Sequence, residues 1–176
     1  MRSIQRNRVK ERQPGSSDSF YDTFESPIGT LYLIVSGKVL RGIDFKKPSE
    51  IPRKDIASHL IKKELREYFE HGKDEFTQKI DPANGTEFEK NVWFTLRGIP
   101  LGETRTYKWL AEKIGKPNAS RAVGQALGKN PLPIILPCHR IIESDGSLGG
   151  YSGGIDIKRR LLEMEYYMKM AKKSYP

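Results

Sequence analysis

The stretch PLPIILPCHRII, residues 131–142, contains the only cysteine of the chain, Cys138. An apolar run precedes Cys138, and His139 and Arg140 follow it. A lone cysteine is by default a small buried hydrophobic residue. It becomes a nucleophile when a nearby base, cation or helix N-terminus stabilises its thiolate. His139 and Arg140 are candidates for that electropositive setting, although in an extended segment residues 138 and 139 point to opposite faces.

A glycine-rich segment, LGGYSGG at residues 148–154, follows this stretch and holds four glycines in seven residues. Glycine lets a backbone lie close to a ligand. Tyr151, at the centre of the segment, could stack on a flat ring or donate a hydrogen bond. A mobile surface loop is the alternative interpretation.

The last predicted helix begins near Asp156 and carries an apolar stripe of Ile157, Leu161, Met164 and Met168. At about 100° per residue, Glu165 falls between Leu161 and Leu162 in angle and would face inward. A buried carboxylate needs a partner, and a histidine is a natural one. An exposed pair between Glu165 and Lys169 fits the spacing equally well.

Three helices are predicted upstream of the cysteine, over residues 87–97, 106–115 and 119–129. Thr86 and Glu89 form a capping box before the first helix. Thr106 opens the second, and Asn118 is the candidate N-cap of the third. Two short helices joined by the turn GKPN are typical of a helix-turn-helix, although many helical hairpins share this spacing.

The third of these helices is rich in small residues, namely Ala119, Ser120, Ala122, Gly124, Ala126 and Gly128. Small side chains let a backbone approach a partner closely. The first turn also holds Arg121, where the helix dipole disfavours a cation. A DNA-binding helix explains both features. Packing against another helix, or simple exposure to solvent, explains them as well.

Residues 19–45 have the pattern of a β-meander, with three apolar strands separated by the turns SPIG and SGK. A helix is predicted from Lys54 to His71, with Gly72 as its stop signal. Its apolar residues follow helical spacing and are Ile56, Leu60, Ile61, Leu65, Tyr68 and Phe69. Predicted domains are a flexible basic tail (1–17), an N-terminal α/β domain (18–80), a linker (81–85) and a C-terminal domain (86–176).

The composition of the 176 residues, with 36% hydrophobic and 30% charged residues, fits a globular protein whose long charged side chains cover apolar surface. No apolar run approaches the roughly 20 residues of a membrane span. The first residues lack a signal-peptide core, and one cysteine cannot form an internal disulfide. We therefore expect a cytoplasmic protein that does not act at a membrane.

The net charge of +9 is unevenly distributed along the chain. Residues 1–17 have five basic and one acidic residue (+4), residues 18–84 have eleven and twelve (−1), and residues 85–176 have fifteen and nine (+6). A basic C-terminal half indicates a polyanionic partner such as nucleic acid. Ordinary solubility charge is the alternative.

The motif PCHRII, with RAVGQALGKNP before it and YSGG and LLEME after it, resembles the O6-alkylguanine-DNA alkyltransferases. The match runs in order through about residues 86–166. Residues 18–80 resemble the variable N-terminal domain of that family. The resemblance implies an α+β fold of two small domains. The first is a ribonuclease H-like β-meander plus helix, and the second is a winged helix-turn-helix.

The resemblance also implies catalytic roles. Cys138 would accept the alkyl group, His139 would form the thiolate through a water, and Glu165 would orient His139. Asn130 would link the recognition helix to the active site. Tyr107 would help to swing the 3′ phosphate and would protonate the departing guanine. Arg140 is expected to be structural and stays outside the catalytic set.

Binding roles follow from the same resemblance. Arg121 would enter the base stack from the minor groove and replace the extruded nucleotide. The guanine pocket would be lined by Tyr151, Ser152 and Gly153. The remaining DNA-binding residues would be Ala119, Ser120, Ala122, Gly124 and Gln125.

The expected activity is that of a methylated-DNA–[protein]-cysteine S-methyltransferase. It would move an alkyl group from O6-alkylguanine, and from O4-alkylthymine, in double-stranded DNA to Cys138. No second cysteine is present to resolve the thioether, so each molecule would act once. We expect a monomer that uses no cofactor. A structural zinc is not expected either, because the N-terminal half has no cysteine and only two histidines, His59 and His71.

Two other classes of protein are considered. A non-catalytic DNA-binding module, such as an alkyltransferase-like lesion sensor or a winged-helix regulator, would share the helix-turn-helix, but such sensors lack the acceptor cysteine. A thiol redox protein with one reactive cysteine would not explain the small-residue helix, Arg121 or the basic C-terminal half.

Overall fold

The alternating apolar residues near the start of the chain form a three-stranded antiparallel sheet in the computed structural model, which describes residues 19–53, 58–82 and 84–174. Its strands, in spatial order, are β1 (Ser19–Ser26), β2 (Gly29–Ser36) and β3 (Val39–Asp44). Gly29 and Gly37 turn the chain between them with φ angles of 112° and 59°, which glycine adopts without strain. The predicted meander is confirmed.

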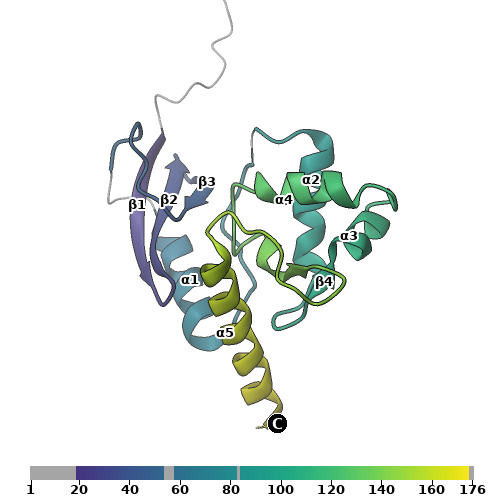
Figure 1. The fold of residues 1–176 in the computed structure, drawn as a ribbon. Coiled ribbons are helices and arrows are strands. Elements are labelled where there is room, and N and C mark those ends of the chain that lie inside the picture. Colours follow the sequence, from purple (N-terminus) through teal and green to yellow (C-terminus); the bar gives the residue numbers. More distant parts are fainter. Residues whose placement is uncertain (1–18, 54–57, 83, 175–176) are drawn as a thin grey trace, which may run out of the picture.

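Helix α1 (His59–His71) packs beside this sheet (Figure 1). Phe69 of α1 stacks on Phe24 of β1 with 6.2 Å between ring centroids. Gly72 ends the helix in the left-handed conformation (φ 61°), as its stop signal predicts. The buried face is formed by Ile61, Leu65, Tyr68 and Phe69.

The predicted start of this helix was wrong. The helix begins at His59, because Ser58 has the non-helical angles φ −109° and ψ 20°. The predicted first residues, 54–57, lie outside the described ranges. Leu60, which was placed in the apolar stripe, is 46% exposed.

The second part of the chain is mainly helical, with α2 (Glu87–Thr95), α3 (Tyr107–Lys113) and α4 (Ser120–Gly128). The predicted capping box is confirmed, since Thr86 and Glu89 accept hydrogen bonds from each other's backbone N–H. The Thr106 hydroxyl caps α3 by accepting from the N–H of Trp109, 3.1 Å away.

The N-cap of α4 is Ala119, and the prediction of Asn118 was wrong. A turn places Ala119 there, because its N–H donates to the Lys116 carbonyl at 2.9 Å. The Ala119 carbonyl then accepts the first helical hydrogen bond, from Val123, at 2.8 Å. Helices α3 and α4 with this turn form the helical pair that the spacing predicts.

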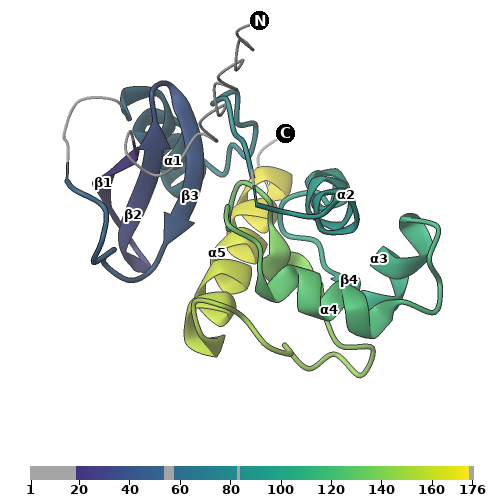
Figure 2. The same ribbon diagram turned by 90° about the horizontal axis from the view of Figure 1, so that it is seen from above.

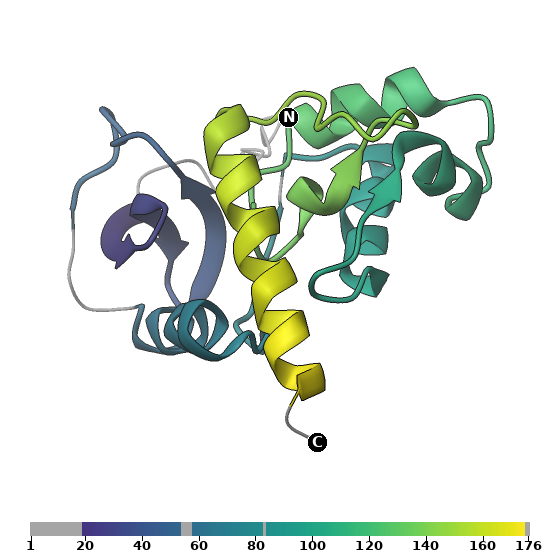
Figure 3. The ribbon, with the colours of Figure 1, turned by 60° about the horizontal axis from the view of Figure 1, so that its bottom comes forward.

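Short elements follow α2 and α4. The 3₁₀ turns are η2 (Leu96–Gly98) and η3 (Cys138–Arg140), and the two-residue strands β4 (Arg105–Thr106) and β5 (Ile141–Ile142) pair in parallel. Helix α5 (Ile155–Ser174) runs between the sheet part and the helical part (Figures 2 and 3). In the described ranges, no helix combines the length and the hydropathy that crossing a bilayer requires.

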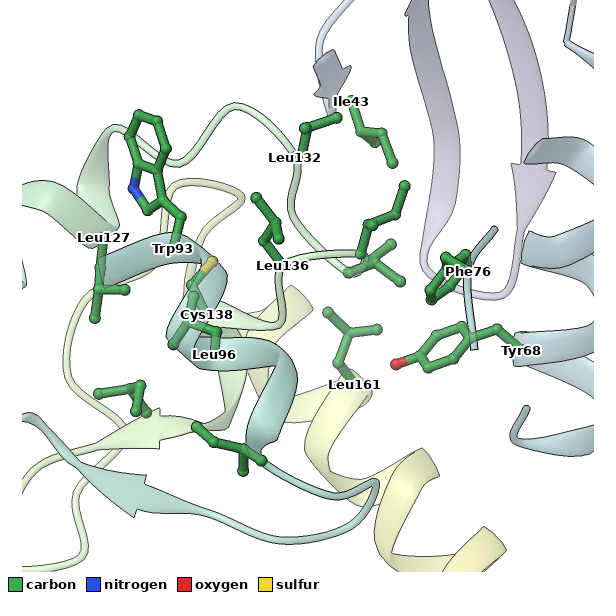
Figure 4. Packing of buried hydrophobic residues seen from close by; sticks show 14 of the residues in the cluster. Ile43, Tyr68, Phe76, Trp93, Leu96, Leu127, Leu132, Leu136, Cys138 and Leu161 are labelled. Carbon is green, nitrogen blue, oxygen red and sulfur yellow. The ribbon is translucent and has the colours of Figure 1, made fainter. Parts of the chain in front are cut away.

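The two parts share one hydrophobic core. Figure 4 shows Cys138 on the helical side of this core, and Tyr68 and Phe76 on the side of α1. The N–H of Ile43 on β3 donates to the carbonyl of Pro131 at 2.9 Å, so the segment that leads to the cysteine lies along the sheet edge. The predicted α+β class, with strands first and helices second, is confirmed. The exact domain boundaries stay a prediction.

Candidate active site

Cys138 begins the 3₁₀ turn η3 and is 5% exposed. Asn130 holds it from the end of α4. The Asn130 Nδ2 group donates to the Cys138 sulfur at 3.1 Å and to the Leu136 carbonyl at 2.8 Å, and its Oδ1 accepts from the N–H of Leu132 at 3.0 Å. One amide therefore joins α4 to the segment that presents the sulfur.

The resting thiol is protonated. Burial raises the pKa of Cys138 from 9.0 to about 11, and the hydrogen bond from Asn130 and the charge of Lys158 oppose this only in part. A nucleophile at this position therefore needs a group that takes its proton.

Glu165 faces inward, which decides between the two interpretations of its spacing. It is fully buried, and its Oε1 lies 2.9 Å from His139 Nε2. Lys169 pairs with Glu103 instead, at 2.9 Å. Residues 138 and 139 lie in a 3₁₀ turn rather than in an extended segment, and the turn directs His139 toward α5.

The protonation of this pair can be assigned from its chemistry. Burial would raise the pKa of Glu165, but the charges and hydrogen bonds of His139 and Arg140 hold it well below 4.5. The carboxylate can only accept, so Nε2 of His139 carries a proton. The other ring nitrogen, Nδ1, is buried and has no hydrogen-bond partner among the described residues. In the neutral imidazole, Nδ1 is free to accept a proton.

Several further groups hold the Glu165 carboxylate. Arg140 donates from Nε and Nη2 at 2.8–3.2 Å, and the Gly102 N–H donates to Oε2 at 3.2 Å. The Tyr68 hydroxyl of α1 donates to Oε1 at 2.6 Å. Arg140 also forms an ion pair with Asp74 at 3.0 Å. Residues from both parts of the chain thus fix the partner of His139.

Sequence reasoning did not assign Tyr68 or Gly102 to this site, and it left Arg140 outside. Tyr68 was predicted only as an apolar position of its helix. The sequence did contain a signal for Arg140. A buried Glu165 carboxylate needs positive charge around it, and Arg140 follows His139 directly in the sequence. No local pattern points to Tyr68, which lies 97 residues from Glu165 in the sequence.

A cavity of about 580 Å³ opens over Cys138. This volume falls within the roughly 300–1,000 Å³ of small-molecule sites. Its lining comprises Tyr107, Ser120, Arg121, Gly124, Leu127, Gly128, Cys138, Glu143, Gly150, Tyr151 and Ser152. The predicted residues Tyr107, Tyr151, Ser152 and Arg121 therefore meet around the sulfur, and Glu143 is an unpredicted acidic member.

Two tyrosines give the cavity aromatic walls. Burial, with the negative charges of Glu143 and Cys138, raises the pKa of Tyr107 above 10.0. Burial raises the pKa of Tyr151 well above 10.0. The Tyr151 hydroxyl is buried and has no hydrogen-bond partner among the described residues. Both phenols are neutral and able to donate to a ligand.

The glycine-rich segment contacts both the cavity and the sheet. A Cβ at Gly149 would lie 2.9 Å from the Tyr107 hydroxyl, and its φ of 67° also favours glycine. Gly153 is not part of the lining. It packs against Phe45, whose ring a Cβ there would approach to 2.7 Å. This contact joins the segment to the N-terminal part, and the predicted contact of Gly153 with a base stays a prediction.

Helix α4 presents the predicted DNA-binding residues. Arg121, Ala122 and Gln125 are exposed, whereas Ala119 and Ser120 are half-buried. Gly124 lies against the Tyr107 ring, because a Cβ there would be 3.6 Å from it. Within the described ranges, no group of three or more His, Cys, Asp or Glu side chains is placed to hold a metal ion.

Comparisons with known proteins agree with this geometry. Residues 19–82 match the family model "6-O-methylguanine DNA methyltransferase, ribonuclease-like domain", and residues 87–167 match "6-O-methylguanine DNA methyltransferase, DNA binding domain". A methylated-DNA–protein-cysteine methyltransferase of Methanosarcina barkeri is 48% identical over 153 residues, which cover 83% of this chain and 96% of the relative.

Solved structures give the same result. The Mycobacterium tuberculosis O6-methylguanine methyltransferase aligns with a TM-score of 0.79 at 42% identity, covering 85% of this chain and 94% of that chain. A structure of the same protein in complex with DNA has the same scores and coverage. The O6-methylguanine-DNA methyltransferase of Pyrococcus kodakaraensis aligns at 0.66 and 28% identity, over 84% and 98% of the two chains. The chain belongs to the methylated-DNA–protein-cysteine methyltransferase family.

Proposed function

We propose that this protein repairs DNA by transferring the alkyl group of O6-alkylguanine to its own Cys138. The observation that carries the proposal is the placement of Cys138 at a cavity of about 580 Å³, with His139 in the same turn and hydrogen-bonded to Glu165 of α5. Relatives that are 43–48% identical bear the name of this activity. A similar Mycobacterium tuberculosis protein was solved in complex with DNA.

The substrate base must leave the duplex to reach the sulfur. Extrusion costs a few kcal/mol in lost stacking and pairing, and a side chain inserted from the minor groove offsets part of that cost. The exposure of Arg121 on the first turn of α4, where it also lines the cavity, supports this role for it. The small residues Ala122 and Gly124 let the helix backbone approach a narrow groove.

The chemical step is an in-line displacement at the alkyl carbon. Cys138 gives its proton to Nδ1 of His139 through a water, and Glu165 stabilises the imidazolium that forms. The sulfur then bonds to the alkyl carbon while the carbon–O6 bond breaks. Tyr107 donates its phenolic proton to the departing guanine and regains one from solvent, and the imidazolium of His139 releases its extra proton to solvent.

The product is a thioether, which neither water nor cellular thiols readily cleave. The reaction is therefore stoichiometric, with one transfer per molecule. O4-alkylthymine offers the same carbon–oxygen bond and is a second substrate of the proposal. The protein acts as a monomer and uses no cofactor or metal.

Intact-mass spectrometry tests this function. The protein is incubated with duplex DNA that holds one O6-methylguanine, and one added methyl group on Cys138 is expected. Cys138→Ser, which keeps a small polar side chain at the site, should gain no mass. Tight binding of this DNA without a mass change would instead favour a lesion sensor.

A comparison of two substrates tests extrusion by Arg121. Arg121→Ala should slow transfer from duplex DNA by at least about tenfold, the factor that corresponds to about 1.4 kcal/mol. Transfer from free O6-benzylguanine, which needs no extrusion, should change little. Equal losses on both substrates would remove this role.

A further inference from the structure

Lys158 of α5 is buried beside the candidate active site, and the proposed mechanism gives it no task. Its side chain is 1% exposed. Nζ donates to the Ile141 carbonyl at 2.6 Å and to the Gly150 carbonyl at 3.4 Å. Both acceptors are neutral, and within the described ranges no carboxylate forms a salt bridge with Lys158. A buried charge without a counter-ion is costly, so its retention calls for a reason.

The two carbonyls belong to two segments of the candidate active site. Ile141 follows η3, the turn that begins with Cys138. Gly150 lines the cavity that contains the sulfur. Lys158 therefore joins the segment after the nucleophile to the wall of the cavity. Burial lowers the pKa of Lys158, and the negative charges of Cys138 and Glu143 oppose this in part. The charge of Lys158 in turn opposes the rise that burial causes in the pKa of Cys138.

Other charged groups around the sulfur are compensated or lie at the rim. Arg140 is neutralised by Glu165 and Asp74. Arg121 and Glu143 are exposed at the cavity mouth. The remaining titratable groups that face Cys138 are the phenols Tyr107 and Tyr151 and the imidazole of His139. Of the buried cations in the described ranges, Lys158 is the one without a carboxylate partner.

We propose that Lys158 is a positioning residue for alkyl transfer, whose ammonium group supplies the counter-charge of the Cys138 thiolate and holds the Gly150 wall against the strand that follows the nucleophile. The inference rests on the proposed function. When His139 takes the proton of the thiol, the sulfur becomes an anion that the ammonium group of Lys158 stabilises.

The test measures thiolate formation without the DNA reaction. The rate of Cys138 alkylation by iodoacetamide is followed from pH 6 to 10.5 in the full chain. Lys158→Gln keeps N–H donors for the two carbonyls but removes the charge, and Lys158→Arg keeps the charge. The whole range lies below the thiol pKa of about 11, so the rate follows the small thiolate fraction, and removing the charge, which raises that pKa by about one unit, should slow the reaction roughly tenfold across it. The Arg variant should stay within about threefold of the wild type.

No loss in the Gln variant would overturn the proposal, and equal losses in the Gln and Arg variants would overturn it in favour of a packing role. Where circular dichroism shows the Gln variant to be unfolded, Lys158→Met provides a second uncharged variant of similar length. Iodoacetamide needs no alkylguanine. If wild-type Cys138 reacts with it but takes no methyl group from DNA, the proposed function fails and the inference about Lys158 is still decided by its own pH profiles.

Discussion

Burial and reactivity oppose each other at Cys138. With a pKa of about 11, an unassisted thiol is only about 0.03% ionised near pH 7.5. The same burial should slow the reaction of the sulfur with unrelated alkylating agents and oxidants. In the proposed mechanism the neighbouring imidazole resolves the conflict, because it takes the proton when a base fills the cavity.

The pH dependence of transfer should reveal this role of His139. His139→Gln keeps a donor for Glu165 but removes the base. Its rate with O6-benzylguanine should follow the free thiolate and rise about tenfold per pH unit from pH 7 to 10. The wild-type rate should be higher at pH 7 and rise less steeply. Rates are measured by single-turnover mass spectrometry, and parallel profiles for the two proteins would contradict a proton-accepting His139.

At this scale the sequence predicts the local chemistry well and the distant partners poorly. Cys138 and His139 are adjacent, and the spacing on the last helix already allows an inward Glu165. Tyr68 and Lys158 carry no such signal. Their contacts depend on how α1 and α5 pack, which periodicity does not specify.

At the scale of elements, a residue that caps one helix can also connect it to another helix. Glu89 accepts from the Thr86 backbone at 2.9 Å and from Lys129, which follows α4, at 2.7 Å. These contacts lower the pKa of Glu89 from 4.5 to about 2, chiefly through the hydrogen bond from Lys129. One side chain thus links the start of α2 to the end of α4.

Acid titration should therefore reveal how much the negative charge of Glu89 stabilises the fold. A lowered pKa in the folded state means that its charge contributes stability above pH 4.5, and that this contribution is lost as the pH falls from 4.5 to about 2. Glu89→Gln should melt at a lower temperature than the wild type at pH 7, and the difference should shrink below pH 4.5. Thr86→Ala should instead cost about 1 kcal/mol at all these pH values. A pH-independent difference for the Gln variant would exclude the ionic contribution.

The elements were predictable where signals are local. The capping box, the glycine stop signal and the alternation of apolar and polar residues each lie within a few residues of sequence. Because these signals are local, the predicted strands and the predicted existence of the helices are confirmed. The errors fall at helix starts. Asn118 is a favourable cap by residue type, but the Lys116–Ala119 turn assigns that position to Ala119.

At the scale of the whole molecule, the N-terminal part completes the network of hydrogen bonds and ion pairs around Glu165 and Arg140. The Tyr68 hydroxyl is fully buried against Glu165, and Asp74 balances the charge of Arg140. Burial and the negative charge of Glu165 raise the pKa of Tyr68 well above 10.0, so this phenol always donates. Neither part can be removed without changing the environment of His139.

Tyr68→Phe tests this coupling. Hydrogen bonds to charged groups contribute roughly 1.5–3 kcal/mol, so the free energy of unfolding in urea should fall by about that amount. Transfer to Cys138 should slow as well, since the carboxylate loses one of its supports. Tyr167→Phe is the matched control, because Tyr167 is 69% exposed and its change should stay within about 0.5 kcal/mol. A Tyr68 variant as stable as this control would show that the contact contributes nothing.

The uneven charge of the chain should determine how it binds DNA. Residues 85–176 carry +6 from fifteen basic and nine acidic residues, whereas residues 18–84 carry −1 from eleven and twelve. Phosphate contacts release counter-ions, so the logarithm of the binding constant should fall steeply and linearly with the logarithm of salt concentration. Lys116 lies exposed in the turn between α3 and α4, and Lys63 lies exposed on α1, on the other side of α5 (Figure 3).

Fluorescence anisotropy over a salt series distinguishes these two lysines. Lys116→Gln should reduce the slope by up to about 1, the loss of one phosphate contact. Lys63→Gln removes the same charge from the chain and should leave the slope unchanged. Equal effects of both changes would mean that net charge, and not the surface around α3 and α4, drives binding. A flat salt response of the unmodified protein would contradict the electrostatic basis of binding altogether.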